Sequence, residues 1–436
     1  MGASFLGSGV DARLDALSPS TARAPIRADA TAGVAARAVE TTLSGQRAVV
    51  LATDLSQASG AIGRAEAELL TAGLTHARLH RLPVVLLIDS AGARLTEGAT
   101  VLGAFRQLQR TVMEAREEDL PMLAVIGRNC FGGASLLAFG AHTRIYPRGS
   151  RLGLSGPRAL STMRPSFDAE HDGAELFRCE SRARHDEDAI LVTDDNGAIA
   201  ATIAAWLHDP GRRSADPVRT RRMLTRRLRM YRGDPATLST SHPPPEVEAR
   251  LDHLFAEGWS AVYCDGLVWG DGWVDGRDTA FAGFVGGRTV NAFGCWQFLE
   301  VMREFARDPA DLPVTLLLDS PGQAPTPEDE QVLLSEFVAA VAEAAHGMRA
   351  GGRSVELWLV GEAGGAVYVA LAAAAGTITA WPGAKLATLP ARIVDGVIGR
   401  KTQDKPSLSA LIEARVFDRW TRSPGFGEWP APHSPS

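Results

Sequence analysis

The chain has 436 residues, of which 45% are hydrophobic, and its formal net charge is −6. This length can bury two or three cores, and so modest a charge argues against nucleic acid or a membrane surface as the partner. The four cysteines form no CxxC pair, which argues against a zinc ribbon and fits a reducing compartment. No apolar run reaches the ~18 residues of a membrane span. We therefore expect a cytoplasmic protein without a bound metal.

The first half of the sequence alternates between strand and helix patterns. Residues 46–54 form a strand-like apolar run, and apolar residues recur at helical spacing over 63–80. A second apolar strand, 83–94, ends in a turn of small residues and leads into a long helical pattern at 99–116. Strands that alternate with helices in this way predict crossover connections and a buried, largely parallel sheet.

The most informative stretch is Leu123–Gly140, a buried strand, a tight glycine turn and a helix of small residues. Adjacent glycines at the start of a helix leave backbone N–H groups facing open space. Such groups stabilise negative charge that develops on a carbonyl oxygen. The candidate oxyanion donors are the N–H groups of Gly132, Gly133 and Ala134.

The same series returns in the second half. Pro313–Ala324 repeats the Pro-Val-x-Leu-Leu-x-Asp-Ser-x-Gly core of Pro83–Arg94. Gly132 lies 49 residues after Pro83, and Gly364 lies 51 residues after Pro313. A long series matched at nearly constant spacing predicts two domains of one fold. The second set of candidate donors is Gly364, Gly365 and Ala366.

Ligands of open parallel sheets bind beyond the carboxyl ends of the strands, where these turns are expected to lie. The alternative is that the glycines only permit close contact between helix and sheet, but matched turns in a repeat favour a functional role. Asp89 and Asp319 are interpreted as turn caps, and Cys130 as a small apolar side chain beside the turn. The expected substrate-binding residues are Ser90, Ala91, Gly92, Cys130, Phe131, Gly156, Gly322 and Gln323.

Nine arginines lie between Arg212 and Arg232. They fit equally well a helix paired with acidic neighbours and a surface for the phosphates of coenzyme A or an acidic carrier protein. Asp265–Gly276 is interpreted as a β-hairpin. The expected parts are a flexible N-terminal segment at 1–40, a first domain at 41–208, an arginine-rich segment and proline-rich linker at 209–250, a second domain at 251–423 and a disordered tail at 424–436.

Several of these stretches resemble a known family. Asp89–Glu97, Cys130–Gly133 and Arg151–Pro157 resemble the β subunit of biotin-independent malonate decarboxylase. Asp319–Ala324 and Gly361–Ala366 are similar to its γ subunit. Both subunits belong to the acyl-CoA carboxyltransferase group. The resemblance therefore implies an α/β fold of two tandem crotonase-like domains, each a ββα superhelix of the carboxyltransferase type.

The resemblance also implies a reaction. A malonyl thioester, carried by an acyl carrier protein or by coenzyme A, would lose CO₂ and become the acetyl thioester. The first turn would hold the enolate oxygen, and the second would face the departing carboxylate. No tightly bound cofactor is expected, because the phosphopantetheine or coenzyme A arrives with the substrate. We expect a homo-oligomer without nucleic-acid or membrane partners.

Two other functions remain open. The first is a biotin-dependent acyl-CoA carboxyltransferase, in which the second turn would hold the biotin carbonyl. The chain lacks the Cys₄ zinc ribbon of the β chain of bacterial acetyl-CoA carboxylase, which favours the decarboxylase branch. The second is a non-catalytic subunit that binds acyl carriers. Its motivation is Ala91 and Gly364, which stand where the related subunits commonly have Gly and Ser.

Overall fold

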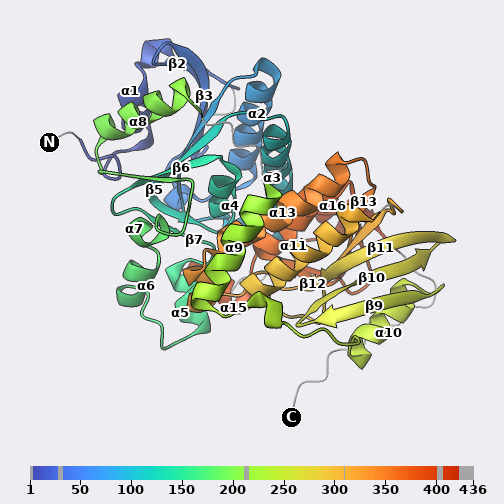
Figure 1. Ribbon diagram of the computed structural model, residues 1–436. Coiled ribbons are helices and arrows are strands. Elements are labelled where there is room, and N and C mark those ends of the chain that lie inside the picture. Colours follow the sequence, from blue (N-terminus) through green and yellow to red (C-terminus); the bar gives the residue numbers. More distant parts are fainter. Residues whose placement is uncertain (1–2, 28–32, 211–215, 309, 400–405, 422–436) are drawn as a thin grey trace.

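The computed structural model describes residues 3–27, 33–210, 216–308, 310–399 and 406–421. Within these residues the chain forms two eight-stranded sheets, one from each half of the sequence, with helices packed between them (Figure 1). This confirms the expected α/β fold of two tandem crotonase-like domains. The predicted tail at 424–436 and the arginines at 212 and 213 lie outside the described residues.

The first sheet has the strand order β1-β2-β3-β4-β5-β6-β8, and β7 pairs with β5. The pairs β1–β2 and β2–β3 are antiparallel, whereas the pairs from β3 onward are parallel. The strands expected at 46–54 and 83–94 are confirmed as β3 and β4. The strands are β1 (Ala24–Pro25), β2 (Ala36–Leu43), β3 (Gln46–Thr53), β4 (Val84–Ser90), β5 (Met122–Phe131), β6 (Thr143–Pro147), β7 (Arg151–Gly153) and β8 (Ala189–Val192).

The second sheet has the order β16-β14-β13-β12-β11-β10-β9, and β15 pairs with β13. β10 is antiparallel to both β9 and β11, which confirms the hairpin expected at Asp265–Gly276. The remaining pairs are parallel. The strands are β9 (Trp259–Cys264), β10 (Leu267–Val274), β11 (Arg277–Phe284), β12 (Val314–Ser320), β13 (Val355–Gly364), β14 (Thr377–Ala380), β15 (Lys385–Ala387) and β16 (Arg419–Trp420).

The helices follow the alternation that the sequence predicts. No helix among the described residues has the length and apolar character needed to cross a bilayer. The helices of the first half are α1 (Val10–Leu17), α2 (Arg64–His80), α3 (Val101–Glu117), α4 (Gly133–Gly140), α5 (Pro157–Met163), α6 (His171–Leu176), α7 (Cys179–Arg182) and α8 (Asn196–His208). Those that follow are α9 (Pro217–Tyr231), α10 (Pro245–Leu254), α11 (Ala292–Arg307), α12 (Pro327–Gln331), α13 (Leu334–Ala350), α14 (Gly365–Ala374), α15 (Ala391–Ile398) and α16 (Leu408–Glu413).

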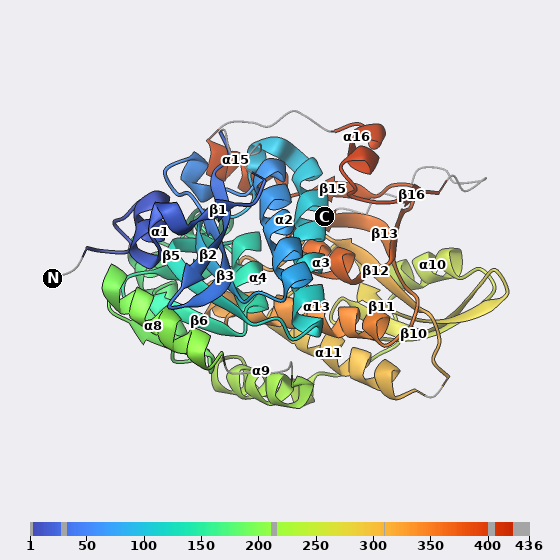
Figure 2. The same cartoon turned by 90° about the horizontal axis from the view of Figure 1, so that it is seen from above.

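The two halves share one core. α3 packs against α14, and α4 packs against α13. Figure 2 shows α3, α4 and α13 lying between the two sheets. Buried side chains from both halves, among them Phe105, Leu137, Phe337 and Val367, belong to a single hydrophobic cluster. Apolar residues of α8 and of the N-terminal segment cover the outer face of the first sheet, and α10 covers that of the second.

The expectation of a flexible N-terminal segment is wrong for residues 3–27. α1 lies in this segment, and Phe5 is only 1% exposed. The Arg13 guanidinium reaches the buried Asp89 carboxylate at 2.7 Å. These contacts join residues 76 positions apart, so no local pattern in a short polar segment reveals them.

The segment at 209–250 is also more ordered than a linker. Its described part contains α9 and α10, and the arginines of α9 pair with acidic side chains. Arg219 reaches Asp188 at 3.0 Å, and Arg221 reaches Glu300 at 2.6 Å. Arg227, only 3% exposed, reaches Glu336 at 2.8 Å. For these arginines the helix paired with acidic neighbours is confirmed.

Candidate functional site

The first glycine turn joins β5 to α4. Gly132 has a φ of +59°, which favours glycine, and its N–H donates to the Leu154 carbonyl at 3.1 Å. The structure therefore removes Gly132 from the candidate donors. The next two N–H groups, those of Gly133 and Ala134, open α4 and have no acceptor among the described residues. Two of the three expected donors are therefore without a partner in the described part of the protein; Gly133 is partly exposed, whereas Ala134 is buried.

The turn after β4 lies directly against this site. Gly92 has a φ of +104°, and a Cβ added to it would lie 3.0 Å from the Phe131 carbonyl oxygen. Ser90 is buried, and its hydroxyl accepts the Gly92 N–H at 3.1 Å, so this side chain stabilises the turn. Ala91 is exposed beside it. The structure thus brings the two expected turns of the first half together.

The other expected residues of the first site support its shape. Burial raises the pKa of the Cys130 thiol, which matches the interpretation as an apolar side chain. The Phe131 ring packs edge-on against Phe177, with ring centroids 5.3 Å apart. Gly156 precedes α5, close to that ring. None of these three side-chain positions offers a reactive group.

The two strand-terminal aspartates hold backbone rather than substrate. Asp89 Oδ1 accepts the Asn129 N–H at 3.1 Å, and Asp319 Oδ1 accepts the Glu362 N–H at 2.8 Å. Asp319 also forms an ion pair with Arg250 of α10, as Asp89 does with Arg13 of α1. Both carboxylates are thus committed to the ends of the strands, as the turn-cap interpretation predicts.

The second turn has the same geometry, displaced by one residue from the expected match. Gly365 has a φ of +60°, and its N–H donates to the Thr388 carbonyl at 3.1 Å. Gly322, at a φ of +123°, lies against the Gly364–Gly365 backbone. Gly365 therefore corresponds to Gly132, and Gly364 is extended strand with a φ of −167°. Aligning the two Gly-Gly pairs in the sequence placed the equivalence one residue too early.

The second turn differs from the first in its next donor. The Ala366 N–H donates to the side-chain oxygen Oε1 of Gln323 at 3.0 Å. Gln323 is 8% exposed. Gly365 and Ala366, both expected donors, are therefore already bonded within the protein. In the second turn these two N–H groups have acceptors within the protein, whereas in the first turn those of Gly133 and Ala134 have none among the described residues.

A carboxylate from the second half fixes the first site. Glu330 of α12 accepts the Leu154 N–H at 3.0 Å and the Ser155 N–H at 2.5 Å. Leu154 in turn holds Gly132 through its carbonyl oxygen. Burial raises the pKa of Glu330 to about 7, and the nearby Arg182 guanidinium opposes this rise. The sequence gives no sign of this role, because Glu330 lies in an acidic run that reads as solvent-exposed surface.

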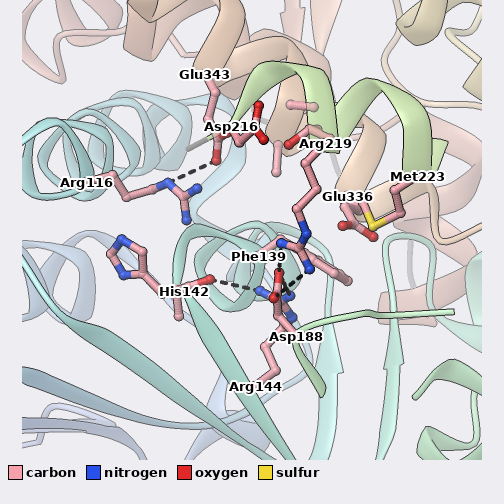
Figure 3. Close-up of a pocket in the computed structure, with 14 residues that line it drawn as sticks. Arg116, Phe139, His142, Arg144, Asp188, Asp216, Arg219, Met223, Glu336 and Glu343 are labelled. Atoms are coloured by element: carbon pink, nitrogen blue, oxygen red, sulfur yellow. Dashed lines mark hydrogen bonds and ion pairs between the residues drawn. The ribbon is translucent and has the colours of Figure 1, made fainter. Parts of the chain in front are cut away.

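Two cavities lie elsewhere at the junction of the halves. A small one, of about 60 Å³, lies among α3, α4, α9 and α13 (Figure 3). In its wall Arg116 lies 3.0 Å from Glu343, and burial lowers the pKa of His142 to about 4. A larger one, of about 670 Å³, lies beside α6, α7 and α12. Neither is lined by the glycine turns.

The sequence places the chain among known proteins. The carboxyl transferase domain family matches residues 27–415, nearly the whole described chain. The chain belongs to this family. Among the described residues, no group of three or more His, Cys, Asp and Glu side chains is arranged to hold a metal ion.

Curated relatives are acetyl-coenzyme A carboxylase carboxyl transferase subunits beta/alpha. The protein of Salinispora arenicola is 26% identical over 323 residues, which are 66% of this chain and 55% of that protein. The protein of Salinispora tropica is 32% identical over 120 residues, which are 27% of this chain and 21% of that protein. The chain thus spans about half or less of the length of these relatives.

Solved structures are similar at lower identity. A Pseudomonas malonate decarboxylase heterodimer matches at 24% identity and a TM-score of 0.45, covering 52% of this chain and 96% of that one. A transcarboxylase 12S with hydrolysed methylmalonyl-coenzyme A matches at 16% identity and a TM-score of 0.40, covering 95% and 86%. The family assignment rests on the sequence match.

Proposed function

We propose that the chain decarboxylates a malonyl thioester to the acetyl thioester, with an enolate as the intermediate. The observation that carries the proposal is that the N–H groups of Gly133, which is partly exposed, and of Ala134, buried behind it, have no acceptor among the described residues. A thioester oxygen that accepts both would gain negative charge as CO₂ leaves, and donors fixed in advance stabilise that charge. The carbon–carbon bond breaks without a side-chain base, because its electrons pass into the enolate as CO₂ leaves. The enolate carbon then takes a proton from water to give the acetyl thioester.

The asymmetry of the two turns favours decarboxylation over carboxyl transfer. A transferase holds two carbonyl-bearing ligands, and in the resembling family each uses one turn. In this chain the Ala366 N–H already has an acceptor in Gln323. A reaction with one acyl substrate needs only the first turn. The substrate would bring its own phosphopantetheine or coenzyme A, and the protein would need no tightly bound cofactor.

A biotin-dependent acyl-CoA carboxyltransferase is the second candidate. The names of the curated relatives described above, acetyl-coenzyme A carboxylase carboxyl transferase subunits beta/alpha, favour it. It differs from the first candidate in its acceptor, because it leaves the carboxyl group on biotin instead of releasing CO₂. A non-catalytic subunit would bind acyl carriers and convert none.

The test is mass spectrometry of malonyl-CoA and of a malonyl-loaded acyl carrier protein, each incubated with the pure protein without biotin. We expect the malonyl species to lose CO₂ and appear as acetyl, and the carrier that reacts faster is the substrate. Conversion that requires biotin would support the transferase. No conversion under either condition would leave a binding protein.

A proline pair tests which turn acts. Ala134→Pro removes one open N–H at the second position of α4, where proline is tolerated, and we expect kcat to fall about 100-fold. Val367→Pro removes the corresponding N–H of the second turn and is the matched control, with a much smaller expected effect. Circular dichroism and urea unfolding check that both variants fold. A large loss in Val367→Pro alone would reverse the assignment of the turns.

A further inference from the structure

The second turn contains its own carbonyl ligand. Gln323 Oε1 accepts the Ala366 N–H at 3.0 Å, and a Cβ added at Gly365 would lie 2.4 Å from the same oxygen. The carboxamide oxygen therefore lies directly against the glycine turn. It occupies the place that a substrate carbonyl would take to reach this N–H.

The first turn has the same backbone without this side chain. The Ile62 N–H donates to the Gly92 carbonyl at 2.8 Å, and the Ile62 carbonyl accepts the Arg94 N–H. Ala93 is the residue between these two hydrogen bonds. Val290 donates to the Gly322 carbonyl at 2.9 Å and accepts the Ala324 N–H, which brackets Gln323. Ala93 and Gln323 are thus equivalent positions. The methyl group of Ala93 cannot accept a hydrogen bond, so the Gly133 N–H stays open.

A tethered carbonyl is a strong competitor. Gln323 is part of the same domain, so its oxygen is present at the N–H at a high effective concentration. A second ligand must break this bond before forming its own, and its net gain from the N–H is close to zero. At the first turn a ligand gains the full interaction.

We propose that Gln323 is a specificity-determining residue: it fills the second hole and excludes a second ligand with a neutral carbonyl, such as the urea group of biotin. The inference deepens the proposed decarboxylation and rests on it. It also explains how one fold with two matched turns uses a single acyl substrate. The simplest alternative is that Gln323 only caps the first turn of α14 and has no effect on ligand choice.

The test compares wild type with Gln323→Ala, using free biotin as the probe. Isothermal titration calorimetry measures binding, and acetyl-CoA formation from malonyl-CoA is followed with and without biotin. In the transfer reaction the malonyl carbon–carbon bond breaks, the carboxyl carbon bonds to the biotin N1, and the N1 proton goes to the enolate carbon. We expect biotin affinity to rise at least tenfold in Gln323→Ala, with biotin-stimulated acetyl-CoA formation in this variant alone.

Three further variants test whether the acceptor at position 323 or the side chain itself matters. Gln323→Glu retains an acceptor for the Ala366 N–H and should behave as wild type. The side chain of Gln323→Ser is too short to reach this N–H, so this variant should behave as Gln323→Ala. It takes the place of Gln323→Ala in the test if Gln323→Ala does not fold. Ala93→Gln places the same carboxamide beside the first turn, and we expect kcat/KM for malonyl-CoA to fall at least tenfold.

The outcomes separate the two proposals. Equal biotin affinity in wild type and the Ala and Ser variants overturns the role of Gln323 and leaves a helix cap. If wild type and every variant fail to convert malonyl-CoA, the proposed decarboxylation is overturned, while the calorimetric comparison still decides on Gln323. A wild-type protein whose turnover is already stimulated by biotin contradicts the proposal directly.

Discussion

Glu330 shows how a single carboxyl group balances opposing effects. Burial favours its neutral form and raises its pKa from 4.5 to about 7, while the Arg182 guanidinium and the N–H groups of Leu154 and Ser155 favour the carboxylate. Between these two pKa values the folded protein binds a proton that the unfolded chain does not. The free energy of unfolding therefore falls as pH rises through this window.

We expect Glu330→Gln to remove this dependence. In wild type the contribution of Glu330 to the free energy of unfolding should decrease by about 3 kcal/mol between pH 4.5 and 7. Urea unfolding of both proteins across this range measures the difference in slope. Glu328→Gln, an exposed change on the same helix, is the control. A wild-type curve parallel to that of Glu330→Gln would show that Glu330 does not titrate there.

At the scale of residues, the sequence identified what local pattern can show. Gly133 and Ala134 were predicted because adjacent glycines before a small-residue helix expose backbone donors. Gln323 was placed at the second turn, but as a substrate contact. Its bond to Ala366 depends on a rotamer that only the folded neighbourhood sets. Glu330 was missed because its partners lie 175 and 176 positions away.

Among the elements, α9 combines buried and exposed arginines on one helix. Arg227 donates to the Val332 and His185 carbonyls as well as to Glu336, and is buried. Arg222 of the same helix is exposed. The helix is therefore bonded to both halves of the molecule through one face, and Arg222 lies on its exposed face.

Two alanine substitutions separate these faces. We expect Arg227→Ala to lower the free energy of unfolding by about 3 kcal/mol, because it leaves the buried Glu336 carboxylate without its partner. Arg222→Ala should change it by less than about 0.5 kcal/mol. Urea unfolding at pH 7 measures both. Equal effects of the two substitutions would mean that the buried ion pair of Arg227 does not contribute to the free energy of unfolding.

Elements were predictable where the pattern is strong. The strands 46–54 and 83–94 and the helices 63–80 and 99–116 were found within a few residues, since fully buried apolar runs and helical spacing are local signals. The N-terminal helix α1 was not predicted. It is short, and only its contact with the first sheet makes it stable.

The whole molecule depends on contacts between its halves. Arg110 of α3 donates to the Ala373 and Ala375 carbonyls at the end of α14, where a cation is favourable. Arg106 reaches Asp418 at 2.9 Å. Together with the shared hydrophobic cluster, these bonds make each half part of the other's core.

We therefore expect the halves to unfold together. Differential scanning calorimetry should show one endotherm, with equal calorimetric and van't Hoff enthalpies. Arg227→Ala should shift this endotherm as a whole to lower temperature. Two resolved transitions, of which the substitution moves only one, would show that the halves are independent.

The repeat predicted two domains of one fold, and the structure confirms them. How they meet was not predictable, because the interface consists of helix faces whose apolar residues resemble those of any buried helix. The homo-oligomer and the choice between carrier protein and coenzyme A stay predictions.

The bond network around Glu330 has a consequence for the synthesis of the protein. A ribosome releases the first sheet and the Gly132 turn long before residue 330 emerges. Until then the Leu154 and Ser155 amides lack the carboxylate that anchors them. The nascent first half thus contains every atom of the open donor pair but not the support that sets its geometry. Translation therefore completes the support of this turn only when the second half has been made.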